Sequence, residues 1–213
     1  MVVPFSDPAA DGLVIQRADE RALAQGVDIF KVFELVRKIR NNVEVPMVFL
    51  LYYNVMVQYG IEKFFKRCQE TGVDGLIIPD LPYEESDEIK EYTEKYGVYQ
   101  ISLVSPTSKD RIKNIAKDAK GFLYCISSLG VTGEKSSFVT NFDEFVGTIK
   151  KYTDVPACVG FGVSNGRQVK ELTKYFDGAI VGSAIVKSIA TGESVEERIN
   201  NLREKIQDLK SGL

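Results

Sequence analysis

Six short apolar runs recur along the chain, and this repetition most constrains how it can fold. Each run is apolar on both faces and is followed by a helical pattern, which is typical of a strand buried in a parallel sheet. Repeated strand–helix units of this length predict an α/β fold. The runs begin at Pro46, Asp74, Val98, Gly121, Val155 and Asp177, so consecutive starts lie 22 to 34 residues apart.

The segments between the runs show the periodicity and the capping residues of helices. The segment 54–72 is predicted to be one helix that ends at Gly72. Its expected apolar face carries Val57, Ile61, Phe64, Phe65 and Cys68. Further helices are predicted over 82–97, 107–121, 141–154 and 164–176, with an amphipathic, charged outer helix over 194–212.

The strand inventory favours a barrel that is incomplete. Six runs and an apolar stub at residues 1–5 fall short of the eight strands of a (β/α)8 barrel, with two units absent at the front. A doubly wound sheet accommodates six strands, but no G-x-G-x-x-G nucleotide loop follows a strand. With 213 residues, 44% of them hydrophobic, the chain is expected to form a single domain over 1–213.

Charge and composition exclude several classes of function. The 27 basic and 30 acidic residues are interspersed, so no basic stripe suggests a nucleic acid or a lipid surface as partner, and a small-molecule ligand is expected. Three cysteines without metal-ligand spacing and the absence of histidine argue against a zinc site and favour a reducing compartment. No apolar run is long enough to span a bilayer and no signal peptide is apparent, so a cytoplasmic protein is predicted.

Glycines follow three of the late strands and suggest a phosphate site. They occur at Gly130 to Gly133, at Gly160 to Gly162, and at Gly182, which with Ser183 opens a helix. Bare backbone N–H groups at a strand end and a helix N-terminus suit a phosphate dianion, and barrels commonly hold phosphate after their seventh and eighth strands. The alternative is that these glycines only make tight turns. Their occurrence after consecutive strands favours phosphate binding.

Two carboxylates, Asp7 and Asp11, lie four residues apart in a loop after the N-terminal stub. Charged groups at the carboxyl end of a barrel strand are typical of function, but turn and cap chemistry explains the same residues equally well.

Other polar or reactive residues have structural interpretations that weigh against catalysis. Tyr124 lies inside a strand, where an aromatic side chain is most often core, and Asp80 could cap the next helix. Cys125 and Cys158 are expected to pack inertly, and Lys187 is expected on a solvated helix surface.

Four motifs taken together resemble the alpha subunit of tryptophan synthase. They are "VPFSDPAADG" from Val3, "LGVTG" from Leu129, "GFGVS" from Gly160 and "DGAIVGSAIVK" from Asp177, and they occur in the family's order. The resemblance implies a (β/α)8 barrel that cleaves indole-3-glycerol phosphate to indole and glyceraldehyde 3-phosphate. It also implies a beta subunit as partner, which carries the pyridoxal phosphate and receives the indole. No cofactor is expected on this chain itself.

The resemblance also assigns roles to individual residues. Asp11 would face the indole N–H and stabilise positive charge as C3 is protonated and the carbon–carbon bond breaks. Tyr124 matches the tyrosine of that pocket, while Asp7 and the segment from Asp80 to Pro82 match surfaces that face the beta subunit. The phosphate-binding positions match Gly133, Gly162, Gly182 and Ser183. The lining of the indole pocket and its closing loop match Leu50, Ile77, Thr132 and Phe161.

One departure from the family bears on activity. The family's catalytic glutamate, which protonates C3, would sit just before Met1, and the first two strand–helix units do not match any part of the chain. The sequence is therefore interpreted as a truncated alpha subunit with little or no lyase activity, because one general acid is typically worth about 10² to 10⁴-fold in rate.

Two alternatives stay open at this point. One is a non-catalytic, self-associating barrel remnant that still binds phosphate. Unpaired strand edges near Phe49 and Val181 would favour a homodimer, with elements exchanged between copies. The other is a relative of indole-glycerol-phosphate synthase or phosphoribosylanthranilate isomerase, which explains the glycine loops but not "VPFSDPAADG".

Overall fold

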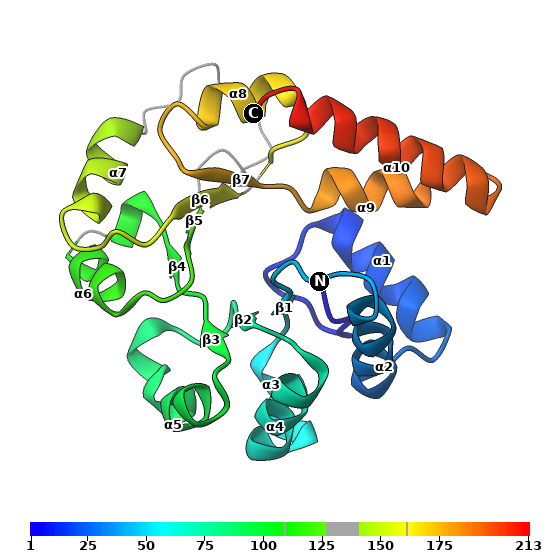
Figure 1. The fold of residues 1–213 in the computed structure, drawn as a ribbon, viewed down its shortest axis with the longest axis horizontal. Coiled ribbons are helices and arrows are strands. Elements are labelled where there is room, and N and C mark those ends of the chain that lie inside the picture. The colour runs from blue at the N-terminus through cyan, green and yellow to red at the C-terminus, as the bar shows by residue number, and fades with distance from the viewer. Residues whose placement is uncertain (109, 127–140, 161) are drawn as a thin grey trace. The chain divides into compact units, whose positions relative to one another are not determined.

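A computed structural model describes every residue of the chain except 109, 127–140 and 161. The chain divides into two compact units, Met1–Ile101 and Ser102–Leu213, each with its own parallel sheet (Figure 1).

The first unit is built on three parallel strands in the order β1-β2-β3. Its elements are α1 (Leu13–Ala24), α2 (Ile29–Arg40), β1 (Val48–Leu50), α3 (Tyr53–Tyr59), α4 (Ile61–Thr71), β2 (Gly75–Ile77), the 3-10 helix η1 (Tyr83–Glu85), α5 (Asp87–Tyr96) and β3 (Tyr99–Gln100). The register pairs Leu50 with Ile77. The N-terminal stub runs parallel to β1, because Val3 N–H donates to the Leu50 carbonyl at 2.9 Å and Leu50 N–H donates to that of Met1 at 2.8 Å.

An aromatic cluster fills the core of the first unit. Phe33 of α2 lies with its ring centroid 5.5 Å from those of both Phe49 in β1 and Phe64 in α4, and all three side chains are fully buried. Burial of each such ring contributes about 1.5–3 kcal/mol, so this cluster stabilises the packing of α2 and α4 on the sheet.

The predicted helix over 54–72 is two helices in the structure, and this corrects the sequence interpretation. Gly60 separates α3 from α4 with φ of +91°, a conformation that L side chains rarely adopt. Phe64, Phe65 and Cys68 are buried on α4 as predicted, but Val57 lies on the separate helix α3 and is exposed. The C-terminus at Gly72 is confirmed, since that residue is left-handed with φ of +80°.

The second unit is built on four parallel strands in the order β4-β5-β6-β7. Its elements are β4 (Leu103–Val104), the 3-10 helix η2 (Pro106–Ser108), α6 (Arg111–Asp118), β5 (Leu123–Ile126), α7 (Phe142–Lys150), β6 (Ala157–Gly160), α8 (Gly166–Leu172), β7 (Gly178–Ile180), α9 (Ser183–Ala190) and α10 (Val195–Lys210). The register aligns Tyr124 with Cys158 and Cys158 with Gly178. Leu123, Cys125 and Val159 are buried, which explains the unbroken apolar runs.

The run from Val98 was predicted as one strand and forms two. Its first half, β3, pairs with β2, and Ile101 N–H donates to the Leu76 carbonyl at 2.8 Å. Its second half, β4, pairs with β5, and the Ser102 carbonyl accepts from Tyr124 N–H at 3.0 Å. The change of partner between Ile101 and Ser102 ends one short ladder and begins the next. Parallel strands that alternate with helices confirm the predicted α/β class.

Candidate functional site

The loop that follows the N-terminal stub holds Asp11 against a tyrosine of the first unit. Tyr52 Oη donates to Asp11 Oδ2 at 2.8 Å and accepts from Ala10 N–H at 2.9 Å. Gln16 of α1 also donates through Nε2 to the Asp11 carbonyl, at 2.8 Å. Burial, followed by the hydrogen bond to Asp11, raises the pKa of Tyr52, so the phenol stays protonated as a donor. The Asp11 carboxylate is thereby oriented by a buried partner.

Asp19 is a second carboxylate beside this loop, and it was not singled out from the sequence. It lies on α1 and is only 5% exposed. Burial, followed by the charge of Asp11, raises the pKa of Asp19 to about 6, while a hydrogen bond from the Phe5 backbone opposes the shift. The Phe5 ring in turn stacks on Tyr52, with centroids 5.0 Å apart. Asp19 and Tyr52 therefore hold the two ends of the loop that carries Asp11.

The apolar positions predicted for the first unit come together at the carboxyl ends of adjacent strands. Leu50 ends β1, Ile77 ends β2, and the two are register partners. Ile77 is buried and Leu50 half-buried. Parallel strands present their last side chains at one edge of the sheet, which is where α/β folds commonly place ligands.

Asp80 does cap a helix, although not the one that follows it. Both of its carboxylate oxygens accept from Tyr53 N–H, at 2.9 and 3.1 Å, so Asp80 caps α3 from the end of β2. Asp7, Asp80 and Pro82 are all exposed.

Tyr124 occupies a space that only a glycine leaves open. It lies on β5, and a Cβ added to Gly160 at the end of β6 would overlap the Tyr124 phenol. The side chain is half-buried rather than part of a closed core. This close approach gives Gly160 a steric reason to be glycine, independent of any turn.

The described glycines that were predicted to bind phosphate, which we call phosphate-type glycines, lie in two loops of the second unit. Gly162 follows β6 with φ of +76°, and Gly182 precedes α9, whose first residue is Ser183. The Gly182 carbonyl accepts from Ile185 and Val186 N–H groups at 3.0 and 3.1 Å. The first N–H groups of a helix have no intrahelical partner and can bind an anion. The remaining predicted positions, Thr132, Gly133 and Phe161, lie outside the described residues.

The expected structural roles of the cysteines and Lys187 agree with the structure. Cys125 is buried, and burial, followed by interactions with Cys158 and Asp177, raises the pKa of its thiol to about 12. Burial likewise raises the thiol pKa of Cys158, so neither is poised as a thiolate nucleophile. Lys187 is exposed on α9. Within the part of the chain that the structure describes, no helix is long and apolar enough to cross a membrane.

The sequence is similar to proteins described as tryptophan synthase alpha chains. A family model described as "Tryptophan synthase alpha chain" matches residues 1–213. The tryptophan synthase alpha chain of Alkaliphilus metalliredigens is 47% identical over 212 residues, which cover 98% of this chain and 80% of that protein. That of Thermoanaerobacter sp. is 46% identical, over 99% of this chain and 80% of its own length.

Solved structures give the same result. The tryptophan synthase subunit alpha from Campylobacter jejuni superimposes with a TM-score of 0.86 at 41% identity, covering 98% of this chain and 82% of its own. The tryptophan synthase A-subunit from Pyrococcus furiosus superimposes with a TM-score of 0.84 at 33% identity, covering 98% and 84%.

Proposed function

The chain belongs to the tryptophan synthase alpha chain family, and from that premise we propose that its polar loops serve the alpha-type lyase reaction of tryptophan biosynthesis. In that reaction indole-3-glycerol phosphate is cleaved to indole and glyceraldehyde 3-phosphate. The observation that carries the proposal is the Tyr52–Asp11 hydrogen bond, which orients the carboxylate of the family's "VPFSDPAADG" loop. The fold is that of the family, of the TIM-barrel type.

Asp11 acts in this proposal as the catalytic carboxylate that accepts from the indole N–H. Protonation of C3 places positive charge on the indole ring, and a fixed carboxylate stabilises that charge without having to reorganise. The bond between C3 and the glycerol chain then breaks, its electrons neutralise the indolenium ring, and the adjacent hydroxyl loses its proton to become the aldehyde. Tyr52 is the positioning residue of Asp11, because its hydroxyl bonds the carboxylate at 2.8 Å.

Phosphate binding is assigned to the glycine loops of the second unit. Gly162, Gly182 and Ser183 supply backbone N–H groups and a hydroxyl, and the N-terminus of the eight-residue helix α9 carries partial positive charge. Gly133 joins them by resemblance.

The indole pocket is assigned to the apolar residues at the strand ends. Leu50 and Ile77, which end adjacent strands, are assigned to contact the indole. Tyr124 is assigned to the same pocket by resemblance. Thr132 and Phe161 complete the set by resemblance.

The level of activity is a separate part of the proposal. The resemblance places the family's general-acid glutamate just before Met1, so a protein of these 213 residues alone would lack it. We expect such a protein to cleave its substrate about 10² to 10⁴-fold more slowly than a family member with that group. The second candidate function is therefore binding without cleavage, favoured by Gly162 after β6 and Gly182 before α9.

The experiment that separates these functions measures binding and cleavage on the same purified protein. Calorimetry gives the affinity for indole-3-glycerol phosphate, and an indole assay gives the rate. Binding with slow cleavage is the expected result, and Asp11→Asn is expected to slow the residual rate further while Asp7→Asn, four residues away, leaves it unchanged. Cleavage at the rate usual for the family would contradict the impaired activity, and absence of binding would contradict the lyase assignment itself.

We further propose that Asp7 and the segment Asp80–Pro82 form part of the surface that meets a beta subunit. Asp7, Asp80 and Pro82 are exposed at the loops after the N-terminal stub and after β2, whereas Leu81 is buried. Co-elution with a family beta subunit tests this, and Asp7→Arg is expected to weaken it.

A further inference from the structure

We propose that Lys205 and Asp208 of the C-terminal helix α10 are positioning residues for the loop between β6 and α8, residues 162–165, and thereby set the affinity for phosphate. The inference rests on the proposed phosphate role of Gly162. Neither residue belongs to any of the four family motifs.

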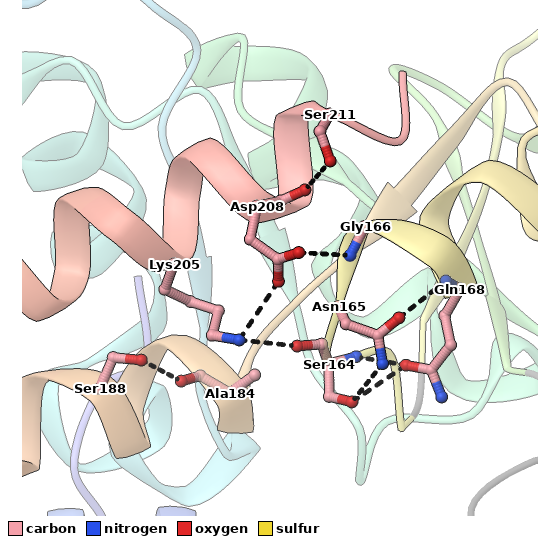
Figure 2. Close-up of polar contacts among 9 residues, drawn as sticks. All are labelled: Ser164, Asn165, Gly166, Gln168, Ala184, Ser188, Lys205, Asp208 and Ser211. Atoms are coloured by element: carbon pink, nitrogen blue, oxygen red, sulfur yellow. Dashed lines mark hydrogen bonds and ion pairs between the residues drawn. The ribbon is translucent and has the colours of Figure 1, made fainter.

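One side chain of α10 reaches the loop and a second reaches the start of α8 (Figure 2). Lys205 Nζ donates to the Ser164 carbonyl at 3.2 Å and lies 3.3 Å from Asp208 Oδ2. The other carboxylate oxygen of Asp208 accepts from Gly166 N–H, the first amide of α8, at 3.3 Å. The Lys205–Asp208 ion pair on α10 therefore contacts both ends of the stretch from Ser164 to Gly166, just after Gly162.

The backbones of α10 and α8 approach as closely as glycine allows. A Cβ on Gly166 would overlap the Asp208 carbonyl, and a Cβ on Gly212 would overlap the Gly166 carbonyl. Gly166 and Gly212 are both buried. Packed contacts of this kind move together, so a displacement of α10 at Asp208 displaces the start of α8 and the loop before it.

The same helix is hydrogen-bonded at its other end to the residues just after α9, the helix that Gly182 and Ser183 open. Asn201 Nδ2 donates to the Thr191 carbonyl at 2.9 Å, and Arg198 Nε donates to that of Gly192 at 3.1 Å. A Ser194–Glu197 capping box fixes the start of α10. Helix α10 thus bridges the helices that follow both phosphate-type loops, α8 and α9.

An open hollow lies beside Lys205. About 370 Å³ in volume, it is lined by Ser188, Thr191, Asn201, Glu204, Lys205 and Asp208. Hydrophilic side chains line this side of α10, and the contacts of Lys205 and Asp208 link it to the loop and to the start of α8.

The loop itself depends on an ordered polar network. Ser164 N–H donates to Gln168 Oε1 at 2.8 Å, and Asn165 caps α8 by accepting from Gln168 N–H at 3.0 Å (Figure 2). A preorganised loop binds an anion more tightly because less conformational entropy is lost on binding. Loss of the Lys205 side chain leaves these local bonds and the Gly166–Asp208 contact but removes the restraint on the Ser164 carbonyl.

The test compares Lys205→Met with Lys174→Met in the full 213-residue chain. Lys205→Met keeps the aliphatic stem and removes the contacts with Ser164 and Asp208. Lys174 is a matched control, because it follows α8 and makes a 2.6 Å surface ion pair with Glu171. Lys205→Arg restores a cationic donor. The probes are inorganic phosphate, titrated by calorimetry, and hydrogen exchange of the amides from Val163 to Val169, with the amides of β5 as internal reference for global unfolding.

The expected result is a three- to tenfold weaker phosphate affinity, about the effect of one or two hydrogen bonds, and faster exchange of the loop amides in Lys205→Met only. Lys205→Arg should recover most of the affinity while β5 exchange stays unchanged throughout. Equal phosphate affinity in Lys205→Met and wild type, or equal weakening in Lys174→Met, would overturn the inference. If wild type binds no phosphate, the phosphate assignment of these loops fails. The loop-exchange comparison then decides the restraint by itself, and unchanged exchange overturns it.

Discussion

Asp19 is an ionisable side chain held at a buried position of α1, and its charge opposes folding. Burial and the neighbouring Asp11 raise its pKa to about 6 from an ordinary 3.8. A carboxyl with a higher pKa in the folded than in the unfolded state binds its proton more tightly when folded. The tighter proton binding of the folded state therefore stabilises the protein fully below about pH 4, and this stabilisation is lost as the pH rises through 6.

The variant Asp19→Asn should remove this pH-dependent cost. Asparagine keeps an oxygen that can accept from the Phe5 amide, and it carries no charge to desolvate beside Asp11. We expect a higher free energy of unfolding than wild type at pH 7.5 and a clearly smaller difference at pH 4.5, as measured by urea denaturation. Glu20→Gln, on the exposed neighbouring residue of the same helix, serves as control. An equal gain in both variants would show that burial at position 19 is not the cause.

Some site residues could be predicted from the sequence around them, and others depend on contacts with residues far away in the chain. Asp11 and Gly182 could be predicted because they follow strand-like runs at loop or helix-start positions. Tyr52 could not, since "FLLYY" reads as a continuous apolar strand, and its hydroxyl finds Asp11 only through a contact 41 residues apart in sequence. Asp19 lies among charged neighbours that suggest a solvated face, and the packing of the Phe5 loop is what buries it.

Gly60 shows how one residue divides an element that periodicity joins. The apolar positions on both sides of it fit a single helical pattern, so the sequence predicted one helix over 54–72. The backbone at Gly60 instead takes φ of +91°, which ends α3 and lets α4 begin in a new direction. A glycine inside a helical pattern costs only about 1 kcal/mol, so pattern alone does not decide whether the helix continues.

Two glycine substitutions with opposite expected signs test this interpretation. Gly60→Ala should lower the free energy of unfolding by about 1 kcal/mol or more, because alanine is strained at positive φ. Gly147→Ala lies inside α7, where the added methyl meets no described atom within 4 Å, and should raise stability by about 0.4–1 kcal/mol. Chemical denaturation of both variants provides the comparison. A stabilising Gly60→Ala would indicate that a continuous helix is compatible with the fold.

Helix starts in the second unit were predictable because their signals are local. Asn141 and Asn165 each accept from an amide three residues on, and Ser194 forms a full capping box. The division of the run from Val98 into β3 and β4 was not predictable, since it depends on which neighbouring strand each half pairs with. Pairing partners are set by tertiary structure rather than by the residues of the run.

At the scale of the whole molecule, both units leave apolar side chains open to solvent. Leu13 at the start of α1 is 69% exposed and Val195 at the start of α10 is 72% exposed. In the second unit β7 is the last strand in the order, and all three of its residues are only half-buried. Sheet edges and exposed apolar side chains each recruit a partner strand or a second copy. This supports the proposal that a protein of these 213 residues self-associates.

A homodimer is the expected state at micromolar concentration, and light scattering after size exclusion measures it. The dimer would have a mass of about 48 kDa, twice the 23.8 kDa of the chain. Leu13→Asp and Val195→Asp together should shift the equilibrium toward monomer. Each position is the first residue of a helix. An acidic side chain there interacts favourably with the helix dipole, so neither helix should be weakened. Val45→Asp, at a valine 64% exposed in the loop before β1, controls for the loss of an apolar group. A wild-type protein that stays monomeric and dispersed would mean that its exposed edges need no second copy, and would direct attention to a beta subunit as the partner that covers apolar surface.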